Sequence, residues 1–266
     1  MKTEVDHYGA QYTHFTYDVY KDIRLETYGE DIGQNGWITA GEQDIFIDWL
    51  DLHEGDHLLD IACGSGGPAL RIAEKTGCTV TGIDIHEAGI KAAKSQAESG
   101  SMSDKATFMV VDADRNLPFE GETFDAVICI DAINHLKNRV GVFSEWKRVL
   151  KPKGKLVFTD PITVTGILSK EDIDIRASIG YFLFVADGVN EKLLDMAGFR
   201  ILDKVDRTGN MALTAINWQT ARQKHADYLL QAEGRDVEGQ QKFLNKCAEL
   251  AKNRSLSRFA YLAVKS

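Results

Sequence analysis

The sequence lacks several features that would place it in other classes of protein. Its 266 residues include only four prolines and four cysteines. No run approaches the ~20 consecutive apolar residues that a membrane-spanning helix needs, and the chain begins with a polar segment instead of an apolar signal core. These absences predict neither a membrane span nor a targeting segment.

The cysteines show neither close pairing nor the spacing of metal ligands. They are Cys63, Cys78, Cys129 and Cys247, and their neighbours are apolar or small. Such cysteines are typical of reduced thiols in the core of a protein from a reducing compartment. We therefore expect a cytoplasmic protein without a metal site.

Positive charge is also in deficit, because 31 Lys and Arg stand against 40 Asp and Glu, for a formal net charge of -9. A field of this sign repels phosphate backbones and anionic lipid surfaces. We expect neither a nucleic acid nor a membrane as partner, and the oligomeric state stays open. The 44% of hydrophobic residues is typical of a globular protein with an ample core.

Short apolar runs alternate with helical patterns through the middle of the chain. This alternation implies parallel strands joined by right-handed crossovers, with helices on both faces of one sheet. The expected strands are 57–62, 79–84, 106–111, 124–130 and 154–160, and the expected helices between them are 67–76, 87–98 and 138–150.

The strongest local signal is a strand that carries a carboxylate and runs into a glycine-rich turn. It reads LLDIACGSGG from Leu58 to Gly67. Glycines permit positive φ and let a ligand approach the backbone. The turn also satisfies the dinucleotide fingerprint G-x-G-x-x-A, so a nicotinamide oxidoreductase stays open as an alternative. Asp60 weighs against it, since a pyrophosphate gains nothing from a carboxylate, whereas a cofactor with a cationic amino-acid tail does.

Two further carboxylates follow neighbouring strands. Asp84 can accept hydrogen bonds from both hydroxyls of a ribose, or it can cap the helix that starts near His86. Asp112 can accept from an adenine amino group while Ala113 offers its backbone amide, or it can be a turn residue. Ligands of open α/β sheets bind at the carboxyl ends of strands, so these carboxylates and Asp60 predict one ligand site.

The run from Asp60 to Pro161 resembles the class I S-adenosylmethionine-dependent methyltransferases. Within them it is similar to the branch that contains phosphoethanolamine, sarcosine and dimethylglycine N-methyltransferases and the ubiquinone/menaquinone C-methyltransferases. One departure is Ala62, where the commonest pattern has glycine. The motifs that carry the resemblance are LDIACGSG at 59–66, GID at 82–84, VDAD at 111–114, LPF at 117–119, FD at 124–125 and RVLKPKG at 148–154.

The resemblance implies a Rossmann-like α/β fold with a seven-stranded sheet. That sheet is mostly parallel with an antiparallel last strand, and it has helices on both faces and helical cap insertions. The resemblance also implies S-adenosylmethionine as cofactor, S-adenosylhomocysteine as product and a small-molecule methyl acceptor. The residues expected to bind the cofactor are Asp60, Ala62, Gly64, Ser65, Gly66, Asp84, Ile85, Asp112, Ala113 and Ile130.

We expect a single domain over residues 1–266, because no linker divides the chain. In its N-terminal part Thr39 and Glu42 have the spacing of a capping box. The expected parts are a helical cover at 1–51, the cofactor-binding core at 52–165, cap or lid elements at 166–198 and 213–254, and terminal strands at 199–207 and 258–264.

The segment IDAINHL from Ile130 to Leu136 is expected to face the substrate. If a helical turn begins at Asp131, then Asp131 and His135 share one face. A histidine can accept a proton from a nucleophile near neutral pH. The alternative is a His at a helix start beside an Asp of the cofactor site. The resemblance to phosphoethanolamine methyltransferases implies Tyr12 as a catalytic partner of His135; a packed tyrosine is the alternative.

The acceptor is expected to be a small amine and not a phosphobase. Pro161 follows Thr159 and Asp160 where phosphoethanolamine enzymes carry a phosphate-contacting tyrosine, and the sequence here resembles the sarcosine and dimethylglycine enzymes instead. Residues that could line the acceptor site are Tyr181, Phe182, Phe184, Trp218 and His225, and those that could bind one carboxylate or phosphate are Arg176, Arg222 and Lys224.

Other readings stay open at this point. The acceptor atom could be oxygen, sulfur or carbon in place of nitrogen. A module that binds S-adenosylmethionine without catalysis would carry the same glycine turn, although Asp131 and His135 argue against such a loss of activity.

Overall fold

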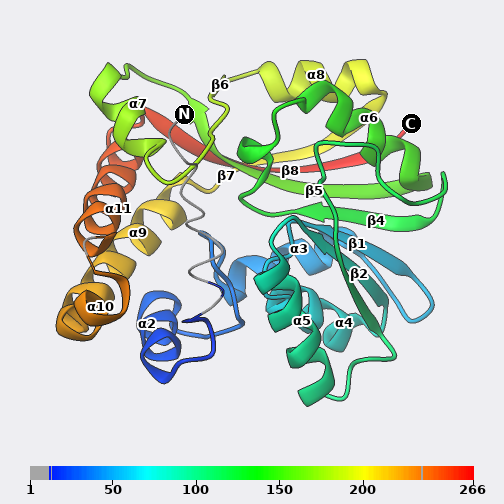
Figure 1. Ribbon diagram of the computed structural model, residues 1–266. Coiled ribbons are helices and arrows are strands. Elements are labelled where there is room, and N and C mark those ends of the chain that lie inside the picture. The colour runs from blue at the N-terminus through cyan, green and yellow to red at the C-terminus, as the bar shows by residue number, and fades with distance from the viewer. Residues whose placement is uncertain (1–11, 13, 235) are drawn as a thin grey trace.

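The computed structural model describes residue 12, residues 14–234 and residues 236–266. Within them, one eight-stranded sheet has the order β3-β2-β1-β4-β5-β8-β7, with β6 beside β5 (Figure 1). The strands are β1 (His57–Ile61), β2 (Thr79–Asp84), β3 (Ala106–Val110), β4 (Phe124–Cys129), β5 (Leu150–Val164), β6 (Val185–Ala186), β7 (Phe199–Asp206) and β8 (Leu256–Lys265).

The predicted α/β fold is confirmed. Strand β8 is antiparallel to both of its neighbours, β5 and β7, while the other strand pairs are parallel. The count is eight and not seven, because the short β6 was not expected. Strand β5 is also longer than the predicted 154–160, since it continues past a register shift between Asp160 and Thr163 to pair with β6 and the start of β8. Pro161 lies at this irregularity, where a proline in a strand is tolerated.

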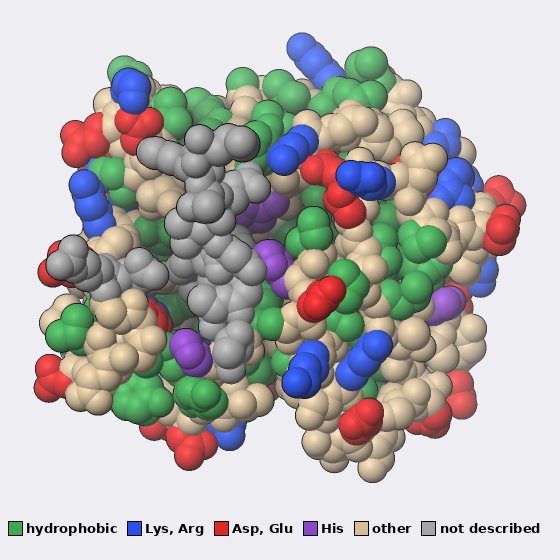
Figure 2. All heavy atoms as spheres, in the orientation of Figure 1, with side chains coloured by type: hydrophobic (Ala, Val, Ile, Leu, Met, Phe, Trp, Pro, Cys, Tyr) green, Lys and Arg blue, Asp and Glu red, His purple; other side chains and the backbone are tan. Residues whose placement is uncertain are grey.

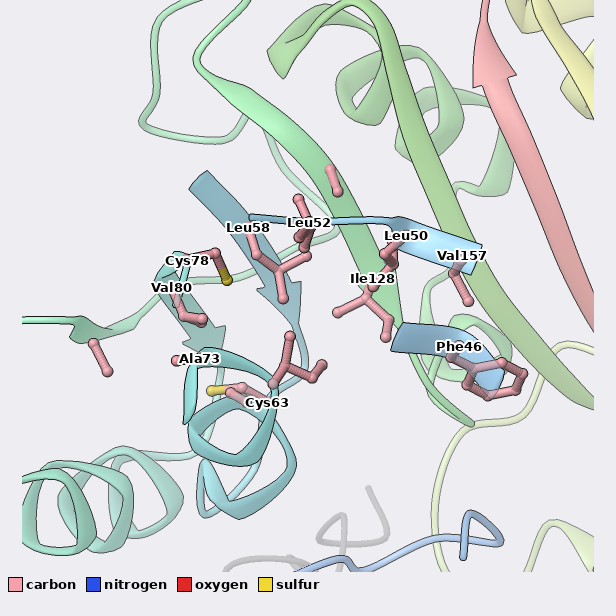
Figure 3. Close-up of a cluster of buried hydrophobic side chains, with 14 of the residues drawn as sticks. Phe46, Leu50, Leu52, Leu58, Cys63, Ala73, Cys78, Val80, Ile128 and Val157 are labelled. Carbon is pink, nitrogen blue, oxygen red and sulfur yellow. The ribbon is translucent and has the colours of Figure 1, made fainter. Parts of the chain in front are cut away.

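Helices cover both faces of the sheet (Figure 1). On one face lie α3 (Ala40–Leu50), α4 (Gly67–Thr76) and α5 (Glu87–Ser99), and on the other lie α6 (Arg139–Val149) and α8 (Val189–Ala197). Figure 3 shows the first core, where Phe46 and Leu50 of α3 pack with strand residues. Trp146 of α6 and Leu194 of α8 belong to the second core.

A helical layer lies at the side of this sandwich (Figure 1). Helices α9 and α11 pack together with Trp37 in one apolar cluster, and α2 packs with α9 and α10 in another through Tyr20, Ile23, Ala221 and Leu229. The predicted cap or lid element at 213–254 is therefore three helices, and the first begins at Thr208, earlier than expected. These elements are α2 (Asp18–Tyr28), α7 (Lys170–Arg176), α9 (Thr208–Lys224), α10 (Ala226–Glu233) and α11 (Asp236–Lys252).

The predicted capping box at the start of α3 is half correct. The Thr39 side chain accepts a hydrogen bond from the Glu42 backbone N–H, as expected of a cap. The Glu42 carboxylate does not return to the Thr39 backbone. Both of its oxygens accept from Arg258 Nη1 of β8, at 2.7 and 2.9 Å, because that buried guanidinium needs a counter-ion.

The four cysteines are buried and unpaired in the structure. In the part of the chain described, none of the helices is both long and apolar enough to cross a bilayer. Cationic and anionic side chains are interspersed on the face that Figure 2 shows.

Candidate active site

A cavity of about 580 Å³ lies at the carboxyl ends of β1, β2 and β4. Strands of an open α/β sheet present their ligand sites at this edge. Its walls come from the glycine turn, the ends of the strands, the loop 33–36 and the cap around Tyr181. The predicted site residues that line it are Tyr12, Asp60, Ala62, Gly64, Ser65, Asp84, Ile85, Asp112, Ala113, Ile130, Asp131 and His135.

The backbone of the glycine turn adopts the positive φ angles that its sequence predicts. Ala62 and Gly64 have φ of 59° and 55°, a region that glycine enters without strain. The Gly64 N–H donates to Asp84 Oδ2 at 2.9 Å, which ties the turn to the end of β2. Ala62 adopts the same left-handed conformation although it is not a glycine, and it lines the cavity.

Gly66 is the predicted cofactor residue that does not line the cavity. Its φ is 79°, and a Cβ built there would lie 2.7 Å from Ala93 Cβ and 2.9 Å from the Phe108 ring. Because Gly66 has no side chain, α4 can begin close to α5 and β3. Gly66 therefore contributes to the packing of these elements.

Asp60 is a buried carboxylate that faces the cavity. Among the described residues no hydrogen bond or ion pair reaches its oxygens. Burial first, and then the Asp84 carboxylate, raises the pKa of Asp60 to about 8. A buried carboxylate without a partner favours a cationic ligand, because the positive charge of the ligand would stabilise the ionised form.

We expect Asp60→Asn to stabilise the ligand-free protein in a pH-dependent way. Because the pKa rises from 3.8 to about 8 on folding, the folded state binds more protons than the unfolded state between these values, and burying Asp60 costs more as pH rises. Each pKa unit corresponds to ~1.4 kcal/mol; since water in the cavity relieves part of this, we expect a gain of about 2 kcal/mol at pH 8. Urea unfolding at pH 5 and pH 8 measures it. A gain equal at both pH values, or shared by the exposed Asp203→Asn, would contradict the assignment.

The Asp84 carboxylate already accepts hydrogen bonds from two backbone N–H groups. Its Oδ1 accepts from the His86 N–H at 2.8 Å and its Oδ2 from Gly64. Burial raises its pKa, while these backbone bonds oppose the rise. The helix-capping alternative is wrong in its detail, because the N-cap of α5 is His86 and has no side-chain cap bond. Each Asp84 oxygen keeps a lone pair for a ligand.

Asp112 lies beyond the end of β3 and is partly exposed. Its oxygens accept from the Asp114 N–H and from Arg115 Nε, both at 3.0 Å. These are the contacts of a turn residue, and they hold the carboxylate at the rim of the cavity that Ala113 also lines.

Asp131 does not share a helical face with His135, so the predicted geometry is wrong. Its φ is 55°, and the 3₁₀ turn that follows covers only Ile133–His135. The carboxylate accepts from Arg258 Nε at 2.6 Å and from the Trp37 N–H at 2.8 Å, and also from Thr159 Oγ1. It is an anchor for the loop 33–36 and β8, because its oxygens are occupied by these donors.

His135 lines the cavity with a defined tautomer. Its Nδ1 lies 2.9 Å from the Tyr181 backbone oxygen, and since a carbonyl only accepts, Nδ1 carries the proton. Nε2 is then the basic nitrogen. Burial lowers the pKa of His135 to about 4, the bond to Tyr181 opposes this, and the Arg176 charge adds to it.

Tyr12 lies over the glycine turn. Its hydroxyl is 2.6 Å from where a Cβ on Gly64 would be, and its ring centroid is 6.0 Å from that of His86. Tyr12 and His135 line the same cavity, so a catalytic partnership between them stays a prediction.

The remaining expected acceptor residues divide into two groups. Tyr181 lines the cavity, and Phe182, Trp218 and Arg176 line a smaller recess beside it. The others lie elsewhere: Phe184 packs in an apolar cluster, Arg222 pairs with Glu233, and both Lys224 and His225 pair with Glu26.

The loop 33–36 is a part of the site that the sequence analysis missed. The Ser65 hydroxyl donates to the Gly33 carbonyl at 3.0 Å, and Gly36, Gln34 and Asn35 line the cavity. A Cβ on Gly67 would lie 2.2 Å from the Ile32 carbonyl, so the close approach depends on glycine. The glycine-rich run at 29–36 was the available signal.

Comparison with known proteins agrees with this arrangement. Residues 59–158 match the family model described as a methyltransferase domain. The chain is 32% identical over 157 residues to 27-O-demethylrifamycin SV methyltransferase of Amycolatopsis mediterranei, covering 56% of this chain and 57% of that one. It spans about half the length of the curated relatives it matches.

Two solved structures share the fold at low identity. Phosphoethanolamine N-methyltransferase 2 of Haemonchus contortus, solved with phosphomonomethylethanolamine and S-adenosylhomocysteine, has a TM-score of 0.79 at 20% identity, over 97% of this chain and 60% of that one. The [4+2]-cyclase SpnF has a TM-score of 0.76 at 22% identity, over 96% of both chains. The names differ in chemistry, so the fold does not define the reaction. Residues 59–158 are therefore a methyltransferase domain by their match, and the motifs of this segment resemble those of the class I S-adenosylmethionine-dependent methyltransferases.

Proposed function

We propose that this protein transfers the methyl group of S-adenosylmethionine to a small-molecule acceptor, with an amine as the nucleophile. The observation that carries the proposal is the buried Asp60 carboxylate, which has no partner among the described residues and faces the cavity beside the glycine turn. A cofactor with an ammonium group at one end fits such a carboxylate.

The other residues fit the rest of the cofactor. Asp84 has lone pairs left for ribose hydroxyls, and Ala113 lines the cavity where its backbone amide can meet an adenine ring, with Asp112 at the rim. Ile85 and Ile130 add apolar walls to the same cavity. When bound, S-adenosylmethionine supplies an activated methyl group on a sulfonium.

His135 is the residue placed to act on the acceptor. Because Nδ1 donates to Tyr181, Nε2 can accept a proton from the nucleophile. Its lowered pKa keeps the ring neutral at pH 7. The cap around Tyr181 and the loop 33–36 line the cavity, which supports a role in alignment and in exclusion of water.

An amine is preferred among the possible nucleophiles. Aromatic rings of Tyr181 and Phe182 lie near His135, the latter with a centroid distance of 4.6 Å, and aromatic faces stabilise cationic amines. The names of relatives include a methyltransferase of 27-O-demethylrifamycin SV, sterol 24-C-methyltransferases and an N-methyltransferase, so oxygen and carbon are the alternative acceptor atoms.

We expect both S-adenosylmethionine and S-adenosylhomocysteine to bind, and NAD not to bind. Asp84→Ala should weaken binding by ~1–3 kcal/mol, because ligand hydroxyls lose their acceptor. Isothermal titration calorimetry measures this, with the exposed Asp203→Ala as the matched control. A screen of amines, phenols and thiols for S-adenosylhomocysteine formation then identifies the nucleophile. Binding of NAD without S-adenosylmethionine would refute the proposal, and cofactor binding without turnover of any acceptor would favour a non-catalytic module.

A further inference from the structure

A small recess of about 40 Å³ lies beside the cavity and shares part of its wall, including His135. The two spaces therefore lie next to each other at His135. The residues that line both spaces are Asn35, Gly36, Asp131, His135 and Ile179.

Arg176, the last residue of α7, lines this recess and is 2% exposed. Its guanidinium carbon lies 4.7 Å from the Phe182 ring centroid, 4.9 Å from Phe243 and 6.0 Å from Trp37. Within the described residues Arg176 has no carboxylate and no hydrogen-bond acceptor, and its buried Nη1 has no partner. Aromatic faces compensate a buried cation in part, but its planar donors stay unused.

Asn134 lines the same recess and is 1% exposed. Both atoms of its side-chain amide are buried without a partner, although its backbone carbonyl accepts from the Leu183 N–H at 2.7 Å. Buried polar atoms are normally satisfied. A cation and an amide that are both unsatisfied, at one end of a cavity, indicate that a ligand supplies their partner.

The charge in the recess favours a singly charged anion. Asp131 is neutralised by Arg258, and burial lowers the pKa of His135 to about 4, so its ring is neutral at pH 7. Lys246 is occupied by Asp172 and Glu249. Arg176 is thus the uncompensated charge, and its planar fork matches a carboxylate with two parallel hydrogen bonds.

We propose that the methyl acceptor bears a carboxylate, which Arg176 and Asn134 bind in the recess while the nucleophile lies beside His135. This inference rests on the proposed function and names its substrate class. Pro161 also lines the recess and adds no donor, so Arg176 is the one cationic side chain that lines it among the described residues. A phosphate dianion would lack a second cation among these residues.

The test compares matched pairs of ligands that differ only in the carboxylate. Short, branched and aromatic amino acids and their N-methylated forms are titrated against the corresponding amino alcohols, on protein saturated with S-adenosylhomocysteine. We expect at least one amino acid to bind tenfold or more tightly than its amino alcohol. Arg176→Met should abolish that preference and leave the affinity for S-adenosylhomocysteine unchanged, while Arg176→Lys should keep part of it.

Thermal unfolding of the ligand-free variants separates a binding role from a structural one. Arg176→Met should not lower the unfolding midpoint, because it removes a buried charge that has no partner. The exposed Arg200→Met is the matched control and should change neither property. The proposal is overturned if no pair prefers the carboxylate, if phosphoethanolamine binds more tightly than every amino acid, or if Arg176→Met unfolds at lower temperature. If the protein without substitutions does not bind S-adenosylhomocysteine, the proposed function is refuted, and the inference with it.

Discussion

Replacing Arg258 by methionine is expected to lower the free energy of unfolding by about 3–5 kcal/mol, the usual cost of removing one partner from a buried ion pair. Arg258 is fully buried and binds both Asp131 and Glu42. Without it, two buried carboxylates face each other with no counter-ion, although Thr159, Trp37 and Asn210 still donate to them. Urea unfolding monitored by circular dichroism measures the change.

The loss should depend on pH in a defined direction. Burial already raises the pKa of Glu42, and Arg258 opposes that rise, so removal of Arg258 raises the pKa of Glu42 further. The folded variant then holds protons that the unfolded chain releases, and its deficit grows as pH rises above about 4. Glu42→Gln in the same background should restore part of the stability. A loss no larger than that of the exposed Arg115→Met would contradict this account of the cluster.

Substitution of His135 by alanine is expected to reduce turnover by ~10²–10⁴-fold, the usual effect of losing a general base. The dissociation constant for S-adenosylhomocysteine should change little, because the predicted cofactor contacts come from Asp60, Asp84 and the glycine turn. Single-turnover kinetics with the acceptor found in the screen, together with calorimetry, measure the two effects separately. The exposed His53→Ala is the matched control.

The pH profile adds a second check on His135. Its pKa of about 4 means that the ring stays neutral and basic from pH 9 down to about 5. His135 itself should therefore impose no loss of rate between pH 9 and pH 6, and any loss there belongs to protonation of the amine. An unchanged rate in His135→Ala would assign the residue to holding Tyr181 in the cap.

The sequence predicted the α/β core closely because its signals are local. Strand β2 begins and ends at the expected residues, since an apolar run with β-branched residues is bounded by Gly77 and by the carboxylate of Asp84. The cavity-lining residues of the glycine turn follow from the same local pattern. The turn does not reveal which glycine faces the ligand: Gly64 lines the cavity, whereas Gly66 packs against Phe108, a residue from another strand.

The errors concern side chains whose partners are distant in the chain. Asp131 was expected on a helical face, but its position is defined by Arg258, 127 residues away. The expectation that Arg176 could bind a carboxylate or phosphate stays a prediction, but nothing local indicated that Phe182 and Phe243 would bury it. An arginine is usually exposed, so burial of this kind depends on tertiary packing that spacing alone does not encode.

The position of β8 has a consequence for the synthesis of the protein. This strand enters the sheet between β5 and β7 and brings Arg258 to Asp131, which lines the cavity. At about 5–20 residues per second, a ribosome needs roughly 6–25 s to add the 127 residues from Asp131 to Arg258. Late in that interval, once Asp206 has been added, the nascent chain contains β1 to β7 but lacks the cation that neutralises Asp131 and Glu42. Asp131 in the cavity wall therefore gains its counter-ion only after β8 is translated, and a chain stalled before β8 would lack the strand that joins β5 to β7.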